Sequence, residues 1–221
     1  MYKRQVHEGR WQTAIGVDVC GKTLGLMGFG AIAKNVARRA SGFGMKVLAY
    51  DPYVKELPEE FQSYVTLCGE NEVISGCDFL SLHLPLNDET RNMISAPQLA
   101  SMKAGAYVIN AARGGIVNEK DLYEALVSGH IAGAAMDVSE VEPMAEENPL
   151  RTLDNVIIYP HIGGNTTEAA HRASYFAAMG IQEVYEGKAP TWPINDVDYK
   201  TAKTYTDTKK PDTKPAGMFD F

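Results

Sequence analysis

Apolar and polar positions alternate along this chain in two periods, one typical of buried strands and one typical of amphipathic helices. The first apolar run, residues 24–27, is short and bounded by glycines, which indicates a buried parallel strand. The next apolar positions repeat at helical spacing and predict a helix whose buried face consists of Ile32, Val36 and Ala40, with Ala33 and Ala37 beside them. Gly42 and Gly44 end this helix, and residues 45–50 predict a second strand.

The same alternation continues to about residue 159. Helices are predicted at 70–75, at 96–102 behind a Ser95 cap, and from an Asn118 cap to Gly129. Strands are predicted at 78–84, 106–110, 132–138 and 156–159. Repeated strand-helix alternation indicates an α/β fold, a doubly wound parallel sheet with helices on both faces. Ligands bind such sheets at the carboxyl ends of the strands.

A long helix is predicted after residue 164. Asn165 and Glu168 resemble a capping box at its start, and its end is expected at Gly187. One face of this helix carries Ala169, Ala173, Phe176, Gly180 and Val184. From residue 191 onward the chain becomes polar, and little independent order is expected there.

The turn after the first strand matches a dinucleotide-binding pattern. Residues 28–33 are G-F-G-A-I-A, which fits G-x-G-x-x-A. Gly28 allows the tight turn, Gly30 lets the backbone approach a pyrophosphate, and Ala33 lets the helix pack close to the strand. Asp51 ends the second strand about 20 residues later, where a carboxylate can bind the adenosine ribose hydroxyls. Because a carboxylate would repel a 2′-phosphate, the predicted cofactor is NAD rather than NADP.

A second phosphate-binding pattern is rejected. Residues 16–23, G-V-D-V-C-G-K-T, fit the G-x-x-x-x-G-K-[ST] loop of ATP- and GTP-binding proteins. That loop must follow a strand and open a helix, whereas this one leads into the strand predicted at 24–27. Lys22 therefore has no helix N-terminus with which to share a phosphate.

Composition narrows the class of protein. The chain has 221 residues, 45% of them hydrophobic, which suffices for one well-packed domain plus appendages. Its net charge of −7 argues against nucleic acid or an anionic membrane as the partner. No apolar run approaches the roughly 18 residues of a spanning helix, and the sequence has no secretory signal and no metal-ligand cluster. Cys20, Cys68 and Cys77 lack a C-x-x-C pair and predict reduced thiols in a cytoplasmic protein.

Ionisable residues follow the later strands. Arg113 comes after the strand at 106–110, Asp137 lies near the end of the next strand, Glu142 follows it, and His161 follows the last strand. Because the carboxyl ends of parallel strands meet at one edge, Arg113, Glu142 and His161 are expected to converge on the cofactor crevice. Taken singly, His161 could be structural, and Arg113 with its two following glycines could be a simple loop.

Several segments resemble one family. They are 21–33 with Asp51, H-L-P-L at 83–86 with Thr90, M-K-A-G at 102–105, N-A-A-R-G-G-I-V at 110–117, D-V-S-E-V-E-P at 137–143 and P-H-I-G-G at 160–164. Through them, residues 7–190 resemble the NAD-binding domain of the D-isomer-specific 2-hydroxyacid dehydrogenases, the family of D-3-phosphoglycerate dehydrogenase and of glyoxylate and hydroxypyruvate reductases. The resemblance implies a Rossmann-type fold and hydride transfer between NAD(H) and a D-2-hydroxy acid or 2-keto acid.

The resemblance also implies which residues form the site. The catalytic set would be Arg113, Glu142 and His161. The residues near the cofactor would be Gly28 and Gly30 of the turn together with Ala31, Ile32, Asp51, Leu84, Ala111, Ala112, Asp137 and Gly164, several of them through backbone groups.

The chemistry of each catalytic residue type agrees with that set. The planar fork of Arg113 suits the carboxylate and carbonyl oxygen of a 2-keto acid. His161, as imidazolium, would give a proton to the oxygen during reduction and take it back during oxidation. Glu142 would orient the ring and favour its charged form. The hydride chemistry itself belongs to the cofactor.

The resemblance divides the chain into an N-terminal remnant and linker (1–20), an NAD-binding domain (21–188) and a poorly ordered polar tail (189–221). The family builds its substrate domain mainly from a segment preceding the nucleotide domain, so most of that domain is expected to be missing. Residues 1–5, M-Y-K-R-Q, back-translate in one reading to the end of a transposase adapter used in sequencing libraries. They are interpreted as an artefact joined to a gene broken in its interior, and the alternative is a genuine polar terminus.

The expected function is therefore that of an NAD-dependent oxidoreductase, with a small-molecule 2-keto or 2-hydroxy acid as partner and a homodimer as assembly. Two alternatives stay open, an NAD(H)-binding regulatory module and a folded fragment without activity. The substrate is not predicted, because side chains that contact its distal end belong in this family largely to the substrate domain. Hydroxypyruvate, phosphohydroxypyruvate, glyoxylate and pyruvate are all candidates.

Overall fold

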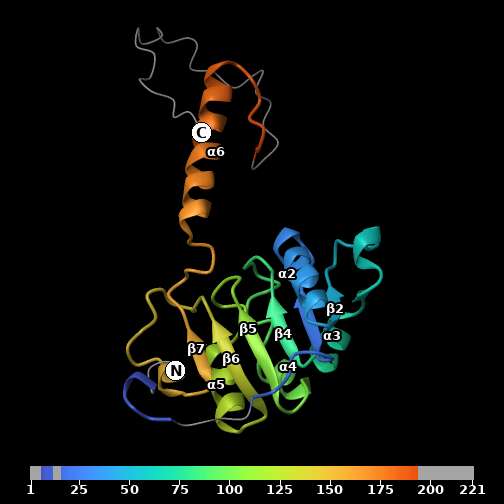
Figure 1. Ribbon diagram of the computed structural model, residues 1–221, viewed down its shortest axis with the longest axis vertical. Helices are drawn as coiled ribbons and strands as arrows, with labels where there is room; N and C mark the ends of the chain where they lie inside the picture. Colours follow the sequence, from blue (N-terminus) through green and yellow to red (C-terminus); the bar gives the residue numbers. More distant parts are fainter. Residues whose placement is uncertain (1–5, 12–15, 194–221) are drawn as a thin grey trace. The chain divides into compact units, whose positions relative to one another are not determined.

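The computed structural model describes residues 6–11 and 16–193, which belong to two compact units, Met1–Gly163 and Gly164–Phe221. The first unit holds a seven-stranded parallel sheet flanked by helices, and the second holds one long helix (Figure 1). The expectations for residues 1–5 and for the polar tail from 194 onward lie outside the described residues.

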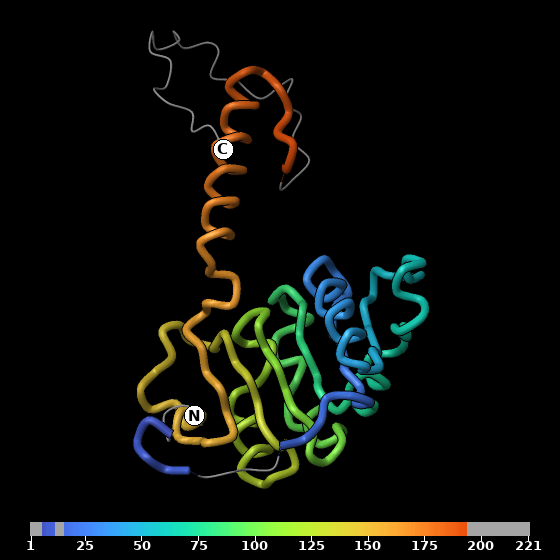
Figure 2. Tube along the Cα trace, viewed as in Figure 1, coloured from blue at the N-terminus to red at the C-terminus, as the bar shows by residue number. Residues whose placement is uncertain are grey.

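The sheet has the strand order β3-β2-β1-β4-β5-β6-β7, and every neighbouring pair is parallel. Its strands are β1 (Thr23–Met27), β2 (Lys46–Tyr50), β3 (Val65–Leu67), β4 (Phe79–Leu82), β5 (Ala106–Asn110), β6 (Ile131–Met136) and β7 (Val156–Ile158). The chain runs outward from β1 to β3, returns to β4 beside β1, and then runs outward to β7, as Figure 2 traces. This confirms the doubly wound α/β fold and places a ligand crevice where the order reverses, between β1 and β4.

Helices cover both faces of the sheet. On one face α2 (Ala31–Gly42) packs over β1, β2 and β3, and on the other lie α3 (Glu70–Gly76), α4 (Ala96–Ser101) and α5 (Glu119–Val127). Two short 3₁₀ helices, η1 (Glu59–Phe61) and η2 (Pro149–Thr152), lie in the connections. The caps predicted at Ser95 and Asn118 are confirmed, since Ser95 forms a capping box with Gln98 and Asn118 accepts a bond from the backbone of Asp121.

The alternation of side chains along β1 separates two hydrophobic cores. Leu24 and Leu26 belong to the core under α2, and Met27 belongs to the core under α3, α4 and α5. Gly25 is small because α3 approaches closely: a Cβ there would lie 2.8 Å from the Cβ of Cys77. Burial raises the pKa of the Cys77 thiol to about 12, which makes it an inert core residue.

Two local predictions were wrong in the first unit. Ile32 was expected on the buried face of α2, but its side chain is 70% exposed, and the buried face consists of Ala33, Ala37 and Ala40. Strand β3 was not predicted, because three residues are too few to show a period. Residues 16–22 lead directly into β1, as the rejection of the ATP-type phosphate loop required.

The second unit contains α6 (Thr167–Tyr185). Its N-cap is Thr166, whose side chain accepts a hydrogen bond from the backbone of Ala169 at 3.1 Å, so the cap predicted at Asn165 was wrong by one residue. Gly187 follows the helix with φ +75°, as its predicted role in ending the helix requires.

Candidate active site

The turn between β1 and α2 contains two glycines, of which one is needed for the backbone conformation and the other leaves open space beside the helix start. Gly28 has φ +90°, and a Cβ there would lie 2.6 Å from the carbonyl oxygen of His83, so only glycine fits. Gly30 precedes α2, and no described atom lies within 4 Å of the position that its Cβ would take. Within the described chain, no side chain caps α2 and no acidic residue lies in its first turn. Backbone N–H groups at such a helix start suit an anion.

The side chain of Asp51 is hydrogen-bonded to the backbone of this turn. Its Oδ2 accepts a hydrogen bond from the backbone N–H of Phe29 at 2.8 Å, and its Oδ1 accepts one from the N–H of Tyr53 at 2.9 Å. Each carboxylate oxygen has a second lone pair, so Asp51 can still accept bonds from ribose hydroxyls. The carboxylate predicted to select NAD is therefore fixed beside the glycine turn by the backbone itself.

Other predicted cofactor residues follow β1, β4 and β5 at the carboxyl edge of the sheet. Ala31 and Ile32 are exposed in the first turn of α2. Leu84 follows β4, and its Cδ2 lies 3.1 Å from the Cβ position of Gly28. Ala111 is exposed and Ala112 is nearly buried, directly after β5.

The loop after β5 is shaped by Asn110, a residue to which the sequence analysis assigned no role. Asn110 is 1% exposed. Its Oδ1 accepts a hydrogen bond from the N–H of Ala112 at 3.1 Å, and its Nδ2 donates to the carbonyl of Arg113 at 3.0 Å. A polar amide at the end of an otherwise apolar strand is the sequence signal that could have identified it.

Asp137 holds the segment that carries His161. The N–H groups of Ile162 and Gly163 each donate to one oxygen of the Asp137 carboxylate at 2.8 Å, and the N–H of His161 donates to the Asp137 carbonyl at 2.7 Å. His161 has φ +55°, in the left-handed region that few non-glycine residues occupy. Three backbone bonds to one residue hold the histidine in this conformation.

The side chains of His161 and Glu142 are in direct contact. Nδ1 of His161 lies 2.9 Å from Oε2 of Glu142, and both side chains are partly exposed. The hydrogen bond from His161, together with one from the backbone N–H of Ser139, lowers the pKa of the Glu142 carboxyl below its usual value. The hydrogen bonds from His161 and Ser139 thus favour the carboxylate form of Glu142.

Arg113 lies on a loop next to this pair but does not bond to it. Its Nη1 donates to the carbonyl of Ala112 at 2.6 Å, and its side chain is otherwise exposed. In the described residues, no hydrogen bond joins Arg113 to Glu142 or His161. The structure therefore brings two of the three predicted catalytic side chains into contact and places the third on an adjacent loop.

Two cavities lie beside Asp137. One of about 790 Å³ is lined by Glu142 and His161. Another of about 340 Å³, at the ends of β5 and β6, is lined by Asn110 and Ala111. Asp137 lines both cavities, and the segment that it holds contributes His161 to the first cavity and Ile162 and Gly163 to the second. The last predicted cofactor residue, Gly164, begins the second unit and stays a prediction.

These features fit a dinucleotide. The open Cβ position of Gly30, the uncapped start of α2 and the Asp51 carboxylate are the groups that a pyrophosphate and a ribose need. Where the chain is described, no group of three or more His, Cys, Asp or Glu residues could hold a metal ion. None of the helices in residues 6–11 and 16–193 is both long and apolar enough to cross a membrane.

Comparison with known proteins agrees with an NAD-binding domain. A family model described as D-isomer specific 2-hydroxyacid dehydrogenase, NAD binding domain, matches residues 1–163. The D-3-phosphoglycerate dehydrogenase of Methanocaldococcus jannaschii is 44% identical over 180 residues, which cover 81% of this chain and 34% of that protein. The hydroxypyruvate reductase of Thermotoga maritima is 47% identical over 171 residues, which cover 75% of this chain and 54% of that protein.

A solved structure shows the same arrangement of the backbone. The crystal structure of D-lactate dehydrogenase with NAD⁺ from Lactobacillus jensenii aligns with a TM-score of 0.77 and 30% sequence identity, over 88% of this chain and 63% of that chain. The chain thus spans only part of the relatives it matches, 34% and 54% of the two curated proteins.

Proposed function

Because the chain belongs to the NAD-binding-domain family of the D-isomer specific 2-hydroxyacid dehydrogenases, we propose that it serves hydride transfer between NAD(H) and a D-2-hydroxy acid or 2-keto acid. The observation that carries the proposal is the 2.9 Å contact between His161 Nδ1 and Glu142 Oε2. It commits Nδ1 to the carboxylate and leaves Nε2 for a substrate oxygen. No described residue hydrogen-bonds to Nε2.

The cofactor would be held mainly by backbone groups. The N–H groups of the Gly28–Gly30 turn and of Ala31 and Ile32 suit the pyrophosphate, and Asp51 suits the adenosine ribose. Ala111 and Asp137 line the cavity at the ends of β5 and β6, Ala112 follows Ala111 in the same loop, and Leu84 lies beside Gly28. When bound, NAD supplies the hydride acceptor or donor.

The side chains of the site would position the substrate and move a proton. Arg113, on a solvent-facing loop, would bind the substrate carboxylate through its fork of N–H donors. His161 would donate a proton from Nε2 to the ketone oxygen in reduction and accept it in oxidation. Glu142 would stabilise the imidazolium and keep Nδ1 protonated, which fixes the tautomer.

The test measures binding and turnover separately. NADH binding is followed by the change in its fluorescence, and turnover by the loss of nicotinamide absorbance with hydroxypyruvate, phosphohydroxypyruvate, glyoxylate and pyruvate in turn. The relatives include a D-3-phosphoglycerate dehydrogenase, a hydroxypyruvate reductase and a glyoxylate reductase, which supports testing the first three acids before pyruvate. His161→Ala should abolish turnover and leave NADH binding unchanged, whereas His171→Ala, an exposed histidine on α6, should change neither.

Three outcomes are distinct. Turnover that His161→Ala removes supports the proposal. NADH binding without turnover of any of the four acids indicates the alternatives, a regulatory module or an inactive piece of a dehydrogenase. A chain that does not bind NADH contradicts the proposal.

We also infer a homodimer and a cytoplasmic location. The homodimer follows from the family resemblance, and the location from three cysteines that are all free thiols in the described chain. Light scattering on a sizing column tests the assembly, and a monomer at every concentration would contradict it.

A further inference from the structure

The position of the Glu142 carboxylate depends on the shape of the turn formed by residues 139–142. Its Oε1 accepts a hydrogen bond from the backbone N–H of Ser139 at 3.2 Å, while its Oε2 contacts His161. The hydroxyl of Ser139 donates to the carbonyl of Val141 at 2.7 Å, which closes the turn. The position of the carboxylate therefore follows the shape of this turn.

The turn is held from outside by the first residue of α5. The N–H of Glu140 donates to Oε1 of Glu119 at 2.7 Å, and the N–H of Glu119 donates to Oε1 of Glu140 at 3.1 Å. Each glutamate thus binds the backbone of the other across 21 residues of chain. We call this pair of bonds the Glu119–Glu140 clamp.

The second oxygen of Glu119 holds the far end of the same loop. Nδ2 of Asn148 donates to Oε2 of Glu119 at 2.5 Å. The Asn148 side chain also accepts a bond from the N–H of Leu150 at the start of η2. Glu119 therefore fixes the loop containing Glu142 on both sides, at 140 and at 148.

The other side of the turn packs against the Arg113 loop. A Cβ at Gly114 would lie 1.8 Å from the carbonyl oxygen of Ser139, so the two backbones are in direct contact. The turn is therefore confined between α5 on one side and the loop of Arg113 on the other. A shift of the turn would move Glu142 relative to both of its neighbours in the site.

Ordinary capping of α5 does not account for Glu119. The N-cap of that helix is Asn118, whose side chain accepts the bond from the N–H of Asp121. An acidic residue in the first turn is favourable for the helix dipole wherever its side chain points. Both oxygens of Glu119 are instead directed to the neighbouring loop.

We propose that Glu119 is a positioning residue for the Glu142–His161 pair, acting through the Glu119–Glu140 clamp. It touches neither the substrate nor the cofactor. It holds the turn in the shape that lets Glu142 reach Nδ1 of His161. The catalytic importance of this role rests on the proposed function, whereas its test measures only the titration of Glu142 and needs no turnover.

The test is a titration of the Glu142 carboxyl carbon by ¹³C NMR in the full chain, with the signal assigned by its absence in Glu142→Gln. The midpoint in the unsubstituted chain should lie below that of a free glutamate, since the bonds from His161 and Ser139 lower the pKa of Glu142. Glu119→Ala should move the midpoint upward, because the released turn weakens those bonds. Removal of a negative charge by itself would move it downward, so the direction separates positioning from electrostatics.

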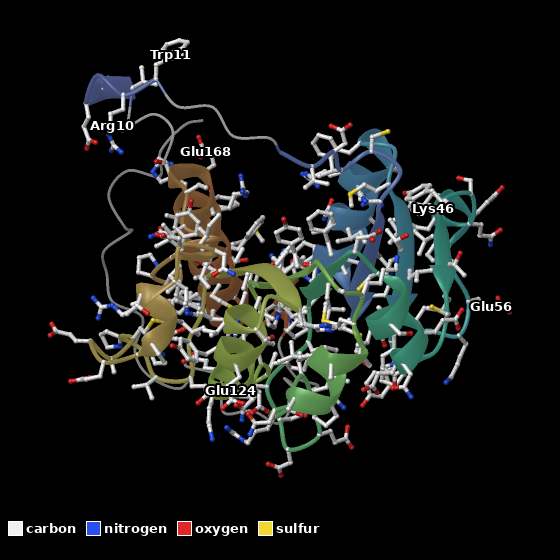
Figure 3. The ribbon with its side chains drawn as sticks, turned by 90° about the horizontal axis from the view of Figure 1, so that it is seen from below. Arg10, Trp11, Lys46, Glu56, Glu124 and Glu168 are labelled. Atoms are coloured by element: carbon white, nitrogen blue, oxygen red, sulfur yellow. The ribbon has the colours of Figure 1, made fainter. Side chains whose placement is uncertain are left out.

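Two variants control the experiment. Glu119→Gln keeps an oxygen that accepts the bond from Glu140 and should restore most of the original midpoint. Glu124→Ala removes a carboxylate from the exposed surface of the same helix, where Figure 3 labels it, and should leave the midpoint unchanged. If Glu119→Ala does not fold, Glu140→Ala removes one half of the clamp and should give a smaller upward shift.

The outcomes are separable from those of the proposed function. A folded Glu119→Ala, or the Glu140→Ala that replaces it, with an unchanged or lowered Glu142 midpoint overturns the positioning role. The same holds if Glu124→Ala shifts the midpoint as much as Glu119→Ala does. NADH titrations of the same samples test the cofactor site independently: loss of binding in the unsubstituted chain would contradict the proposed function and leave the positioning role intact.

Discussion

Asp137→Asn should release the segment that holds His161. The substitution keeps the shape of the side chain and changes only one oxygen to an amide nitrogen. In the structure, both oxygens accept backbone bonds at 2.8 Å, one from Ile162 and one from Gly163. Asparagine can accept one of these bonds, and its NH₂ group then faces the other N–H donor.

The size of the effect follows from these two bonds. A hydrogen bond to a charged group contributes about 1.5–3 kcal/mol, and one such bond is lost outright. The other becomes a neutral bond of roughly half the strength, a further loss of about 0.7–1.5 kcal/mol. The left-handed conformation of His161 itself costs on the order of 1–3 kcal/mol. The expected loss of about 2–4.5 kcal/mol is therefore enough to let the segment leave the left-handed conformation.

Amide hydrogen exchange at Ile162 and Gly163 measures this release directly. A loss of about 2 kcal/mol corresponds to roughly 30-fold faster exchange, since 1.4 kcal/mol is tenfold. Asp154→Asn is the matched control, because Asp154 is exposed and no side-chain hydrogen bond to it occurs among the described residues. Exchange at both amides within twofold of the unsubstituted chain would refute the reasoning.

Three further predictions concern packing, cofactor choice and pH. Gly114→Ala should lower Tm far more than Gly42→Ala. A Cβ at position 114 would lie 1.8 Å from the carbonyl oxygen of Ser139, whereas no described atom lies within 4 Å of a Cβ at position 42. Equal Tm values for the two variants would contradict the contact between Gly114 and Ser139. Asp51→Ala should bring the dissociation constant of NADPH closer to that of NADH, because the carboxylate that would repel the 2′-phosphate is removed. An unchanged ratio of the two constants would count against a contact between Asp51 and the ribose. Burial lowers the pKa of His83 to about 4, so the folded state resists protonation. Between about pH 6.5 and about pH 4 the unfolded state binds a proton on His83 that the folded state does not, so the free energy of unfolding should fall by about 3 kcal/mol over this range. In urea titrations, His83→Gln should lack this part of the pH dependence.

The fold was predictable where periodicity and caps agree. The strand at Ala106–Asn110 has the predicted bounds, and α4 and α5 begin after the predicted caps. Ile32 was misplaced because hydrophobic spacing alone does not show that the first turn of α2 faces the crevice instead of the sheet. Its exposure is a tertiary effect of the glycine turn before it.

The contacts within the candidate site were only partly predictable from the sequence. The contact of Glu142 with His161 agrees with the roles implied by the family resemblance. The bond from the Arg113 side chain to the carbonyl of Ala112 was not foreseeable, since it depends on a side-chain rotamer. Glu119 was missed because its partner, Glu140, lies on another element, and no local pattern links the two.

The backbone of His161 limits what evolution can place at that position. With φ +55°, the residue occupies a region that glycine, asparagine, aspartate and histidine tolerate and that β-branched residues avoid. A saturation library at position 161, selected for folding and never for catalysis, should be enriched in those four residues and depleted of valine and isoleucine. Histidine is then one of few proton-transferring side chains that tolerate this conformation, so the backbone of the loop as well as the chemistry narrows the choice of residue at position 161.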